Sequence, residues 1–205
     1  MKKKFYSVIK KVGNDNHVRN RKYRIEENKN HPVVKLILKK KIKPKKILEI
    51  GCSTGFVLET IRNLTKAKCY GIDVSAKAIN EGKKIFKKIN LKAGHFEDQK
   101  NKNGNFDLII CGFFLFLLPP EKILDLFSKI DQALKYNGHI IIYDFYNNKF
   151  KKKNYKHNND IKVYRWDYKK IMISLPYYNL IYKNKIFKRN MKDFVEVSLI
   201  KKNKI

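Results

Sequence analysis

The chain has 205 residues, the length of one domain, and 43% of them are hydrophobic, which is enough for a packed core and excludes wholesale disorder. Its longest apolar run, residues 108–118, is too short to cross a membrane. Cys52, Cys69 and Cys111 lack the spacing of a disulfide framework or a zinc site. We therefore expect a single-domain cytoplasmic protein with no secretory signal, no membrane span and no bound metal.

The formal net charge is +30, from 48 Lys and Arg residues against 18 Asp and Glu residues. Such a charge suggests contact with nucleic acid, but the lysines are spread along the chain and do not gather in one patch. An A/T-rich coding sequence would also enrich Lys, so two interpretations stay open: a solvated surface set by composition, or a functional basic face. Both predict nonspecific binding to polyanions at low salt.

After a basic N-terminal arm, the hydrophobic pattern alternates between helices and short strands. The expected helices span residues 32–41, 54–64, 75–88 and 120–134. The expected strands span residues 46–50, 68–72, 89–93, 106–111 and 139–143. Strands that alternate with helices in this way predict a doubly wound α/β fold with a mostly parallel sheet.

The last quarter of the chain has a different pattern. Residues 147–160 are rich in Lys and Asn without periodicity, and we expect a loop or lid there. Residues 161–166 are expected to be extended, and residues 167–173 to form a short helical turn. Residues 178–187 and 194–200 are predicted to pair as an antiparallel hairpin, which completes a seven-stranded Rossmann-like sheet.

The strongest chemical signal is the loop after the first expected strand, Glu49-Ile50-Gly51-Cys52-Ser53-Thr54-Gly55. Its glycines let the backbone approach a ligand, and the following helix offers free N–H groups to an anion. The dinucleotide fingerprint GxGxxG does not fit, because Ser53 and Phe56 stand where it needs glycine, and no Walker Gly-Lys-Ser/Thr follows. The shorter loop suits a ligand with a carboxylate and no pyrophosphate.

A second signal, Tyr70-Gly71-Ile72-Asp73-Val74-Ser75, ends the second expected strand. At that place the Asp73 carboxylate can accept hydrogen bonds from both hydroxyls of a ribose. The alternative role for Asp73 is an N-terminal helix cap, which Ser75 can already supply. A glycine loop and an acidic residue at this spacing are more specific together than either is alone.

These segments resemble the class I S-adenosylmethionine-dependent methyltransferases. The resemblance covers residues 32–146, and Ser53 replaces the usual middle glycine of the first motif. Its motifs lie at residues 47–55, 70–75, 106–110 and 134–139. The resemblance implies the fold above, S-adenosyl-L-methionine as the cofactor, and methyltransferase activity.

The resemblance also implies which residues bind the cofactor. Asp73 matches the acid that holds the ribose, and His95 stands where an acid usually contacts adenine. His95 is equally compatible with an exposed loop residue, whereas Phe96 fits as a neighbour of the adenine. The implied cofactor-binding residues are Glu49, Gly51, Cys52, Ser53, Gly55, Asp73, Val74, His95, Phe96 and Cys111.

The acceptor is less well defined. The Asn/Asp-Pro-Pro-Tyr motif, which resemblance would link to amino groups of bases or glutamine, is replaced by residues 111–114, and no Pro-Cys dipeptide is present for cytosine-C5 chemistry. A hydroxyl acceptor needs a general base. The candidates are Tyr143, Asp144, Tyr146 and His157, and the sequence does not select one as catalytic.

We expect residues 1–31 to form an arm over the active site, residues 32–146 to bind the cofactor, and residues 147–205 to supply the lid, the acceptor segment and the hairpin. The run Tyr164-Arg165-Trp166-Asp167-Tyr168 is a candidate wall of the acceptor pocket. Arg19, Arg21 and Arg24 are candidates to bind an anionic acceptor or the methionine carboxylate through their planar guanidinium groups.

The sequence therefore predicts a methyltransferase that acts on a small molecule or a biosynthetic intermediate. Two alternatives stay open. An RNA methyltransferase would explain the charge, and a non-catalytic methyltransferase-like domain would bind the cofactor or a partner without turnover.

Overall fold

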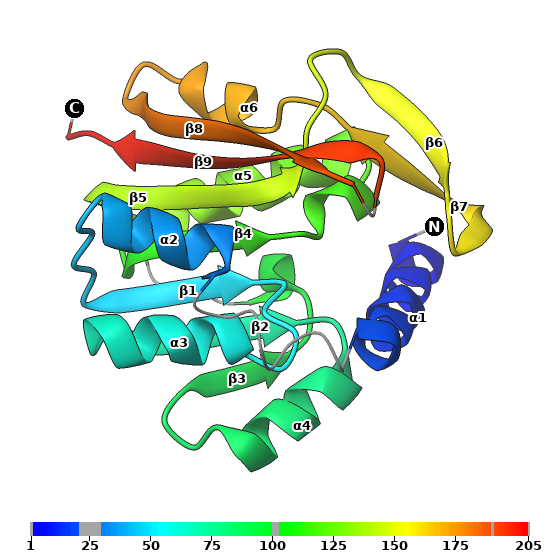
Figure 1. Ribbon diagram of the computed structural model, residues 1–205, viewed down its shortest axis with the longest axis horizontal. Coiled ribbons are helices and arrows are strands. Elements are labelled where there is room, and N and C mark those ends of the chain that lie inside the picture. The colour runs from blue at the N-terminus through cyan, green and yellow to red at the C-terminus, as the bar shows by residue number, and fades with distance from the viewer. Residues whose placement is uncertain (1, 21–29, 100–102, 190, 205) are drawn as a thin grey trace. The chain divides into compact units, whose positions relative to one another are not determined.

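The computed structural model describes residues 2–20, 30–99, 103–189 and 191–204. The chain divides into two compact units, an N-terminal unit of residues 1–100 and a C-terminal unit of residues 101–205. They contribute three and four strands, respectively, to a sheet of seven strands (Figure 1). The predicted α/β class, with a mostly parallel sheet and an antiparallel C-terminal hairpin, is confirmed.

The N-terminal unit is built on parallel strands in the order β3-β2-β1. Its strands are β1 (Lys46–Ile50), β2 (Lys68–Asp73) and β3 (Asn90–Ala93). Its helices are α1 (Lys2–Asn20), α2 (Pro32–Lys39), α3 (Phe56–Thr65) and α4 (Ala76–Ile85), with a 3-10 turn η3 (Phe96–Asp98). Helix α3 packs on β2, and α4 packs on β2 and β3. The carboxyl ends of the three strands thus meet at one edge.

Within the N-terminal arm expected at residues 1–31, residues Lys2–Asn20 form helix α1. It packs against α4 (Figure 1) through two polar contacts. His17 Nε2 lies 3.1 Å from Glu81 Oε2, and the Ser75 hydroxyl donates to Asn14 Oδ1 at 2.7 Å. The sequence gives little signal for this helix because its buried apolar residues are few, with Ile9 and Val12 the main ones among the side chains that the structure describes.

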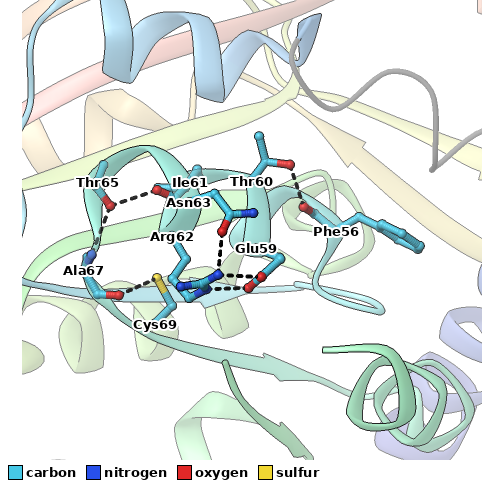
Figure 2. Close-up of polar contacts among 9 residues, drawn as sticks. All are labelled: Phe56, Glu59, Thr60, Ile61, Arg62, Asn63, Thr65, Ala67 and Cys69. Carbon is cyan, nitrogen blue, oxygen red and sulfur yellow. Dashed lines mark hydrogen bonds and ion pairs between the residues drawn. The ribbon is translucent and has the colours of Figure 1, made fainter. Parts of the chain in front are cut away.

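The end of α3 shows how side chains stop a helix before the next strand (Figure 2). The Arg62 guanidinium binds the Glu59 carboxylate through two hydrogen bonds of 2.7 and 2.8 Å, one turn apart on the helix. The Thr65 hydroxyl donates back to the Ile61 carbonyl at 2.8 Å and accepts from the Ala67 N–H at 3.3 Å. These contacts satisfy backbone groups at the turn that leads into β2.

The C-terminal unit has strand order β4-β5-β9-β8, in which β4 and β5 are parallel and β9 is antiparallel to both of its neighbours. Its strands are β4 (Phe106–Gly112), β5 (Leu134–Phe145), β6 (Lys151–Tyr155), β7 (Asn158–Arg165), β8 (Tyr178–Lys188) and β9 (Asp193–Lys202). Its helices are α5 (Pro120–Ala133) and α6 (Lys169–Ile173), with a 3-10 turn η4 (Leu115–Leu117).

Two expectations for this unit need correction. Strand β5 begins at Leu134 and not at residue 139, because its first residues pair with Phe106 before a shift in register. The expected loop at residues 147–160 is wrong as well: β6 and β7 form a two-stranded antiparallel ribbon (Figure 1, yellow). Residues 151–154 are all exposed, so β6 lacks the alternation that reveals a half-buried strand, whereas the extended segment expected at residues 161–166 lies mostly in β7. Among the described residues, no helix has the length and hydropathy to span a membrane.

Candidate functional site

The glycine loop joins β1 to α3 and is fastened to the end of β2. The N–H groups of Gly51 and Cys52 donate to the Ile72 carbonyl at 2.8 and 3.2 Å. Gly51 and Gly55 have φ of 77° and 87°, in the region that favours glycine, and Gly55 is the N-cap of α3. Ser53 also has a positive φ, of 51°, so the residue that replaces the usual glycine holds a conformation that glycine adopts more easily.

Asp73 connects this loop to the start of α4. One of its carboxylate oxygens accepts from the Ser53 N–H and the other from the Ser75 N–H, both at 2.8 Å. Ser75 is the N-cap of α4, and its hydroxyl accepts from the Ala78 N–H at 3.2 Å. Asp73 therefore orders two backbone turns, and because a carboxylate oxygen accepts more than one hydrogen bond, these contacts are compatible with a ribose ligand.

Glu49 is a buried carboxyl group, with 5% of its surface exposed, and in the register of β1 and β2 it lies opposite Gly71. Burial, assisted by the charge of Asp73, raises the pKa of Glu49 to about 8. Its Oε2 atom has no hydrogen-bond partner among the described residues, and the same is true of the buried Thr54 hydroxyl. Unpartnered buried polar atoms are costly, and they mark a place where a ligand can supply the missing partner.

Two glycines that the sequence did not assign to the site let its backbone segments approach closely. A Cβ on Gly82 of α4 would lie 2.3 Å from the Thr54 carbonyl oxygen, and one on Gly71 would lie 2.6 Å from Cys52 Sγ. Gly71 belongs to a recognisable motif, whereas Gly82 is a lone glycine in a helical pattern. Such a glycine is a weak signal for a contact to a loop 28 positions earlier in the chain.

The segment after β3 places His95 and Phe96 beside the same edge, since the Gly94 N–H donates to the Asp73 carbonyl at 2.9 Å. Phe96 is buried. Burial lowers the pKa of His95; Asp98 opposes this effect and Lys10 of α1 adds to it. His95 is therefore half-buried and is not the freely exposed loop residue that was the other interpretation.

Val74 contacts α1, because a Cβ on Gly13 would lie 2.9 Å from its Cγ2. The N-terminal unit thus brings together nine of the ten residues that the family resemblance selects, and α1 reaches the end of the site that contains Val74. The tenth, Cys111, is buried in β4 of the C-terminal unit. Arg21 and Arg24, and the side chain of Arg19, lie outside the described residues.

Asp144, one of the four candidate bases, is buried at the end of β5, and its carboxylate binds backbone N–H groups. Its two carboxylate oxygens accept from the N–H groups of Leu115 and Phe145, each at 2.7 Å. Burial raises its pKa to about 7, although these backbone N–H groups act in the opposite direction. Asp144 therefore fixes the η4 turn that follows β4. His157, another candidate, is exposed in the turn between β6 and β7.

We expect Asp144→Asn to lower the free energy of unfolding by about 1–3 kcal/mol, because the amide nitrogen cannot accept from a backbone N–H. A carboxyl group whose pKa is raised by folding makes the fold less stable as the pH rises from about 4 to about 7. The variant should lose this part of the pH dependence. Urea denaturation at pH 5 and pH 8 measures both effects, and the exposed Asp160→Asn is the control. Equal pH dependence in the variant and the parent protein would contradict the assignment.

Several aromatic residues form one cluster in the C-terminal unit. The Phe113 ring lies 5.3 Å from that of Tyr143 and 4.9 Å from that of Phe145. Phe113 has a φ of 59°, an unusual value for a large side chain. Strain of this kind is found where the surrounding structure fixes a functional loop.

The strand pattern defines an α/β domain of the Rossmann-like type, and the glycine loop and Asp73 lie at the carboxyl ends of its parallel strands, where ligands usually bind in such folds. A family model described as "Methyltransferase domain" matches residues 47–138. This region contains the glycine loop, Asp73 and β4. Over this region the chain is similar to the class I S-adenosylmethionine-dependent methyltransferases, whose cofactor is S-adenosyl-L-methionine.

Solved structures of methyltransferases have a similar fold. The 1,6-didemethyltoxoflavin-N1-methyltransferase of Burkholderia thailandensis, bound to its substrate and S-adenosylhomocysteine, is similar over 98% of this chain and 90% of its own, with a TM-score of 0.79 and 10% identity. A methyltransferase of Methanosarcina mazei is similar over 84% of this chain and 98% of its own, with a TM-score of 0.68 and 14% identity. At such identities the likeness shows the fold.

One curated relative is the ribosomal protein L11 methyltransferase of Prochlorococcus marinus, which is 31% identical over 127 residues. The match covers 54% of this chain and 40% of that protein, so this chain spans less than half the length of its relative.

Proposed function

We propose that this methyltransferase transfers the methyl group of S-adenosyl-L-methionine to a small-molecule acceptor in the cytoplasm. The observation that carries the cofactor site is the unpartnered Glu49 Oε2 beside Asp73, at the edge where the glycine loop leaves β1. A buried acceptor atom in an acidic environment fits the methionine ammonium group, and Asp73 fits the ribose hydroxyls.

The other residues of the site fit the remaining parts of the cofactor. Gly51, Cys52, Ser53 and Gly55 form the loop beside the methionine portion, and the turn at the start of α3 faces its carboxylate. Val74, His95 and Phe96 flank the adenine, and Cys111 of β4 is proposed as a small packing residue. When bound, the cofactor supplies a methyl group on a positively charged sulfonium.

The protein's role in the reaction is alignment. Methyl transfer is an in-line displacement, so the chain must hold donor and acceptor in one line and exclude water. The hydrogen bonds from Ser53 and Ser75 to Asp73 hold the ribose-binding carboxylate at a fixed place. In the C-terminal unit, Asp144 holds the backbone of the η4 turn after β4.

A small molecule is the acceptor that we favour, because the sequence lacks the Asn/Asp-Pro-Pro-Tyr motif of base and glutamine methylation and the Pro-Cys dipeptide of cytosine-C5 chemistry. The similar Burkholderia protein acts on 1,6-didemethyltoxoflavin, which agrees with this choice. Two other acceptors have support. The ribosomal protein L11 methyltransferase favours a protein acceptor, and the net charge of +30 favours RNA.

A labelled-methyl assay separates these acceptors. The full chain is incubated with S-adenosylmethionine labelled at the methyl group and with a small-metabolite fraction, bulk RNA or ribosomal protein. We expect label in the metabolite fraction. Asp73→Ala is the matched control, since loss of its hydrogen bonds should weaken cofactor binding roughly 5- to 150-fold. Label only in RNA or only in protein would overturn the choice of acceptor, and no transfer to any fraction despite binding of the cofactor would favour a non-catalytic domain.

A further inference from the structure

A second polar site lies within the C-terminal unit, at the carboxyl end of β5. Its pocket has a floor from two antiparallel strands, in which Asp144 of β5 pairs with Glu196 of β9 and Ile142 pairs with Ser198. Trp166, Tyr168 and the beginning of α6 form its walls. Carboxyl ends of strands in α/β sheets are the usual place for ligands.

The pocket has an excess of acidic groups, in contrast to the rest of the chain. Asp144, Asp167 and Glu196 line it together with one basic residue, Lys169, whereas basic residues outnumber acidic ones 48 to 18 in the whole sequence. Lys169 Nζ lies 2.5 Å from Asp167 Oδ1 and 2.7 Å from Glu196 Oε1. Lys169 thus contacts two carboxylates, whereas Asp144 accepts hydrogen bonds from backbone N–H groups and interacts with the charge of Arg165.

Two buried polar atoms in this pocket have no hydrogen-bond partner within the described part of the chain. They are Glu196 Oε2, an acceptor, and Trp166 Nε1, a donor. Glu196 has only 6% of its surface exposed, so water does not freely solvate its second oxygen. Carboxylates directly opposite each other on an antiparallel pair disfavour folding. A cluster that is costly for the fold and has unsatisfied atoms is typical of a binding site.

We infer that this pocket binds the amino group of the acceptor, an inference that rests on the proposed methyl transfer to a small molecule. An amino group donates N–H hydrogen bonds to Glu196 Oε2, and its positive form is favoured by the excess of carboxylates. Carboxylate and phosphate groups are disfavoured by the same charges. The space is about that of one water molecule, which suits an amino head and leaves the remainder of the acceptor outside.

Trp166 is the only tryptophan of the chain, so its indole N–H gives a single, assigned nitrogen–proton NMR signal inside the pocket. The probe is methylamine, with methanol, acetate and Mg²⁺ as comparison probes on the full chain. We expect methylamine to shift the signal saturably and the other three to give at least tenfold weaker responses. Glu196→Gln should weaken the methylamine response about tenfold. Glu121→Gln, which removes an exposed carboxylate in the same unit, should leave it unchanged.

Loss of the Lys169 contact can destabilise Glu196→Gln, so a second variant keeps the test decisive. Trp166→Phe keeps an aromatic ring and removes the N–H donor. The thermal midpoint of this variant is measured with and without methylamine. Its stabilisation by the amine should be at least that of the parent protein, because methylamine is protonated near neutral pH and offers no lone pair to an N–H donor. An equal response to methanol or Mg²⁺, an unchanged response in Glu196→Gln, or a response lost in Trp166→Phe would overturn the inference.

Binding of S-adenosylhomocysteine is measured on the same samples, because it tests the proposed function independently. If the parent protein binds S-adenosylhomocysteine and its Trp166 signal does not shift when methylamine is added, the amino-group inference fails and the proposed function stands. If methylamine binds and S-adenosylhomocysteine does not, the proposed function fails and the pocket remains an amine site.

Discussion

Gly82→Ala is expected to destabilise the N-terminal unit although alanine is the better helix former. The new Cβ would lie 2.3 Å from the Thr54 carbonyl oxygen and 2.6 Å from Leu91 Cδ1. The first neighbour is a backbone atom that cannot rotate away, so α4 or the glycine loop must move. Overpacking of this kind costs about 1–3 kcal/mol or more, which exceeds the gain of about 1 kcal/mol in helix propensity.

The thermal midpoint and the affinity for S-adenosylhomocysteine measure the two consequences of Gly82→Ala. We expect the midpoint to fall by about 2–12 °C for a chain of this length. The affinity should fall about tenfold or more, because Thr54 belongs to the loop beside the proposed cofactor. Lys83→Ala changes the next, exposed residue of the same helix and should leave both quantities unchanged. A Gly82→Ala protein with unaltered midpoint and affinity would show that α4 does not need this close approach.

The parallel strands could be predicted from the sequence because both of their faces are buried. In β4, Leu108, Ile109 and Ile110 have no exposed surface, and such strands appear as continuous apolar runs. Strand β6 could not be predicted in this way, because its first four residues are exposed and only Tyr155 is buried. In β7 the buried Ile161 and Val163 flank the exposed Lys162, and this alternation agrees with the extended segment expected at residues 161–166. Strand β6 forms because it pairs with β7, and the periodicity of its own sequence carries no information about that partner.

The candidate site also has a part that could be predicted from the sequence and a part that could not. Glu49, the glycine loop and Asp73 lie in two short segments whose order and spacing are visible in the sequence. Gly82 becomes part of the site only when α4 folds back on the loop, and Glu196 lies opposite Asp144 only because β9 inserts antiparallel beside β5. Contacts between positions so far apart in the sequence leave no local pattern, so they can be identified only from the structure.

Binding of S-adenosylhomocysteine should become tighter as the pH rises from about 6 to about 8. Burial and, to a smaller extent, Asp73 raise the pKa of Glu49 to about 8, so below that pH the free protein holds a proton on this carboxyl group. A methionine ammonium group against Glu49 favours the ionised carboxylate, and binding must then release the proton. The affinity should increase by up to about tenfold per pH unit below pH 8 and become constant above it.

Calorimetry in two buffers of different ionisation enthalpy gives the number of protons released when S-adenosylhomocysteine binds. At pH 7 we expect the release of nearly one proton by the parent protein and by the control Glu121→Gln. Glu49→Gln, which cannot ionise, should bind more weakly at pH 8 and show neither proton release nor this pH dependence. If the parent protein binds with no proton release and constant affinity, Glu49 stays protonated in the complex and does not contact the ammonium group. The unpartnered Oε2 atom would then need another donor, and the buried Thr54 hydroxyl, which is also unpartnered among the described residues, would be the first to test by Thr54→Val.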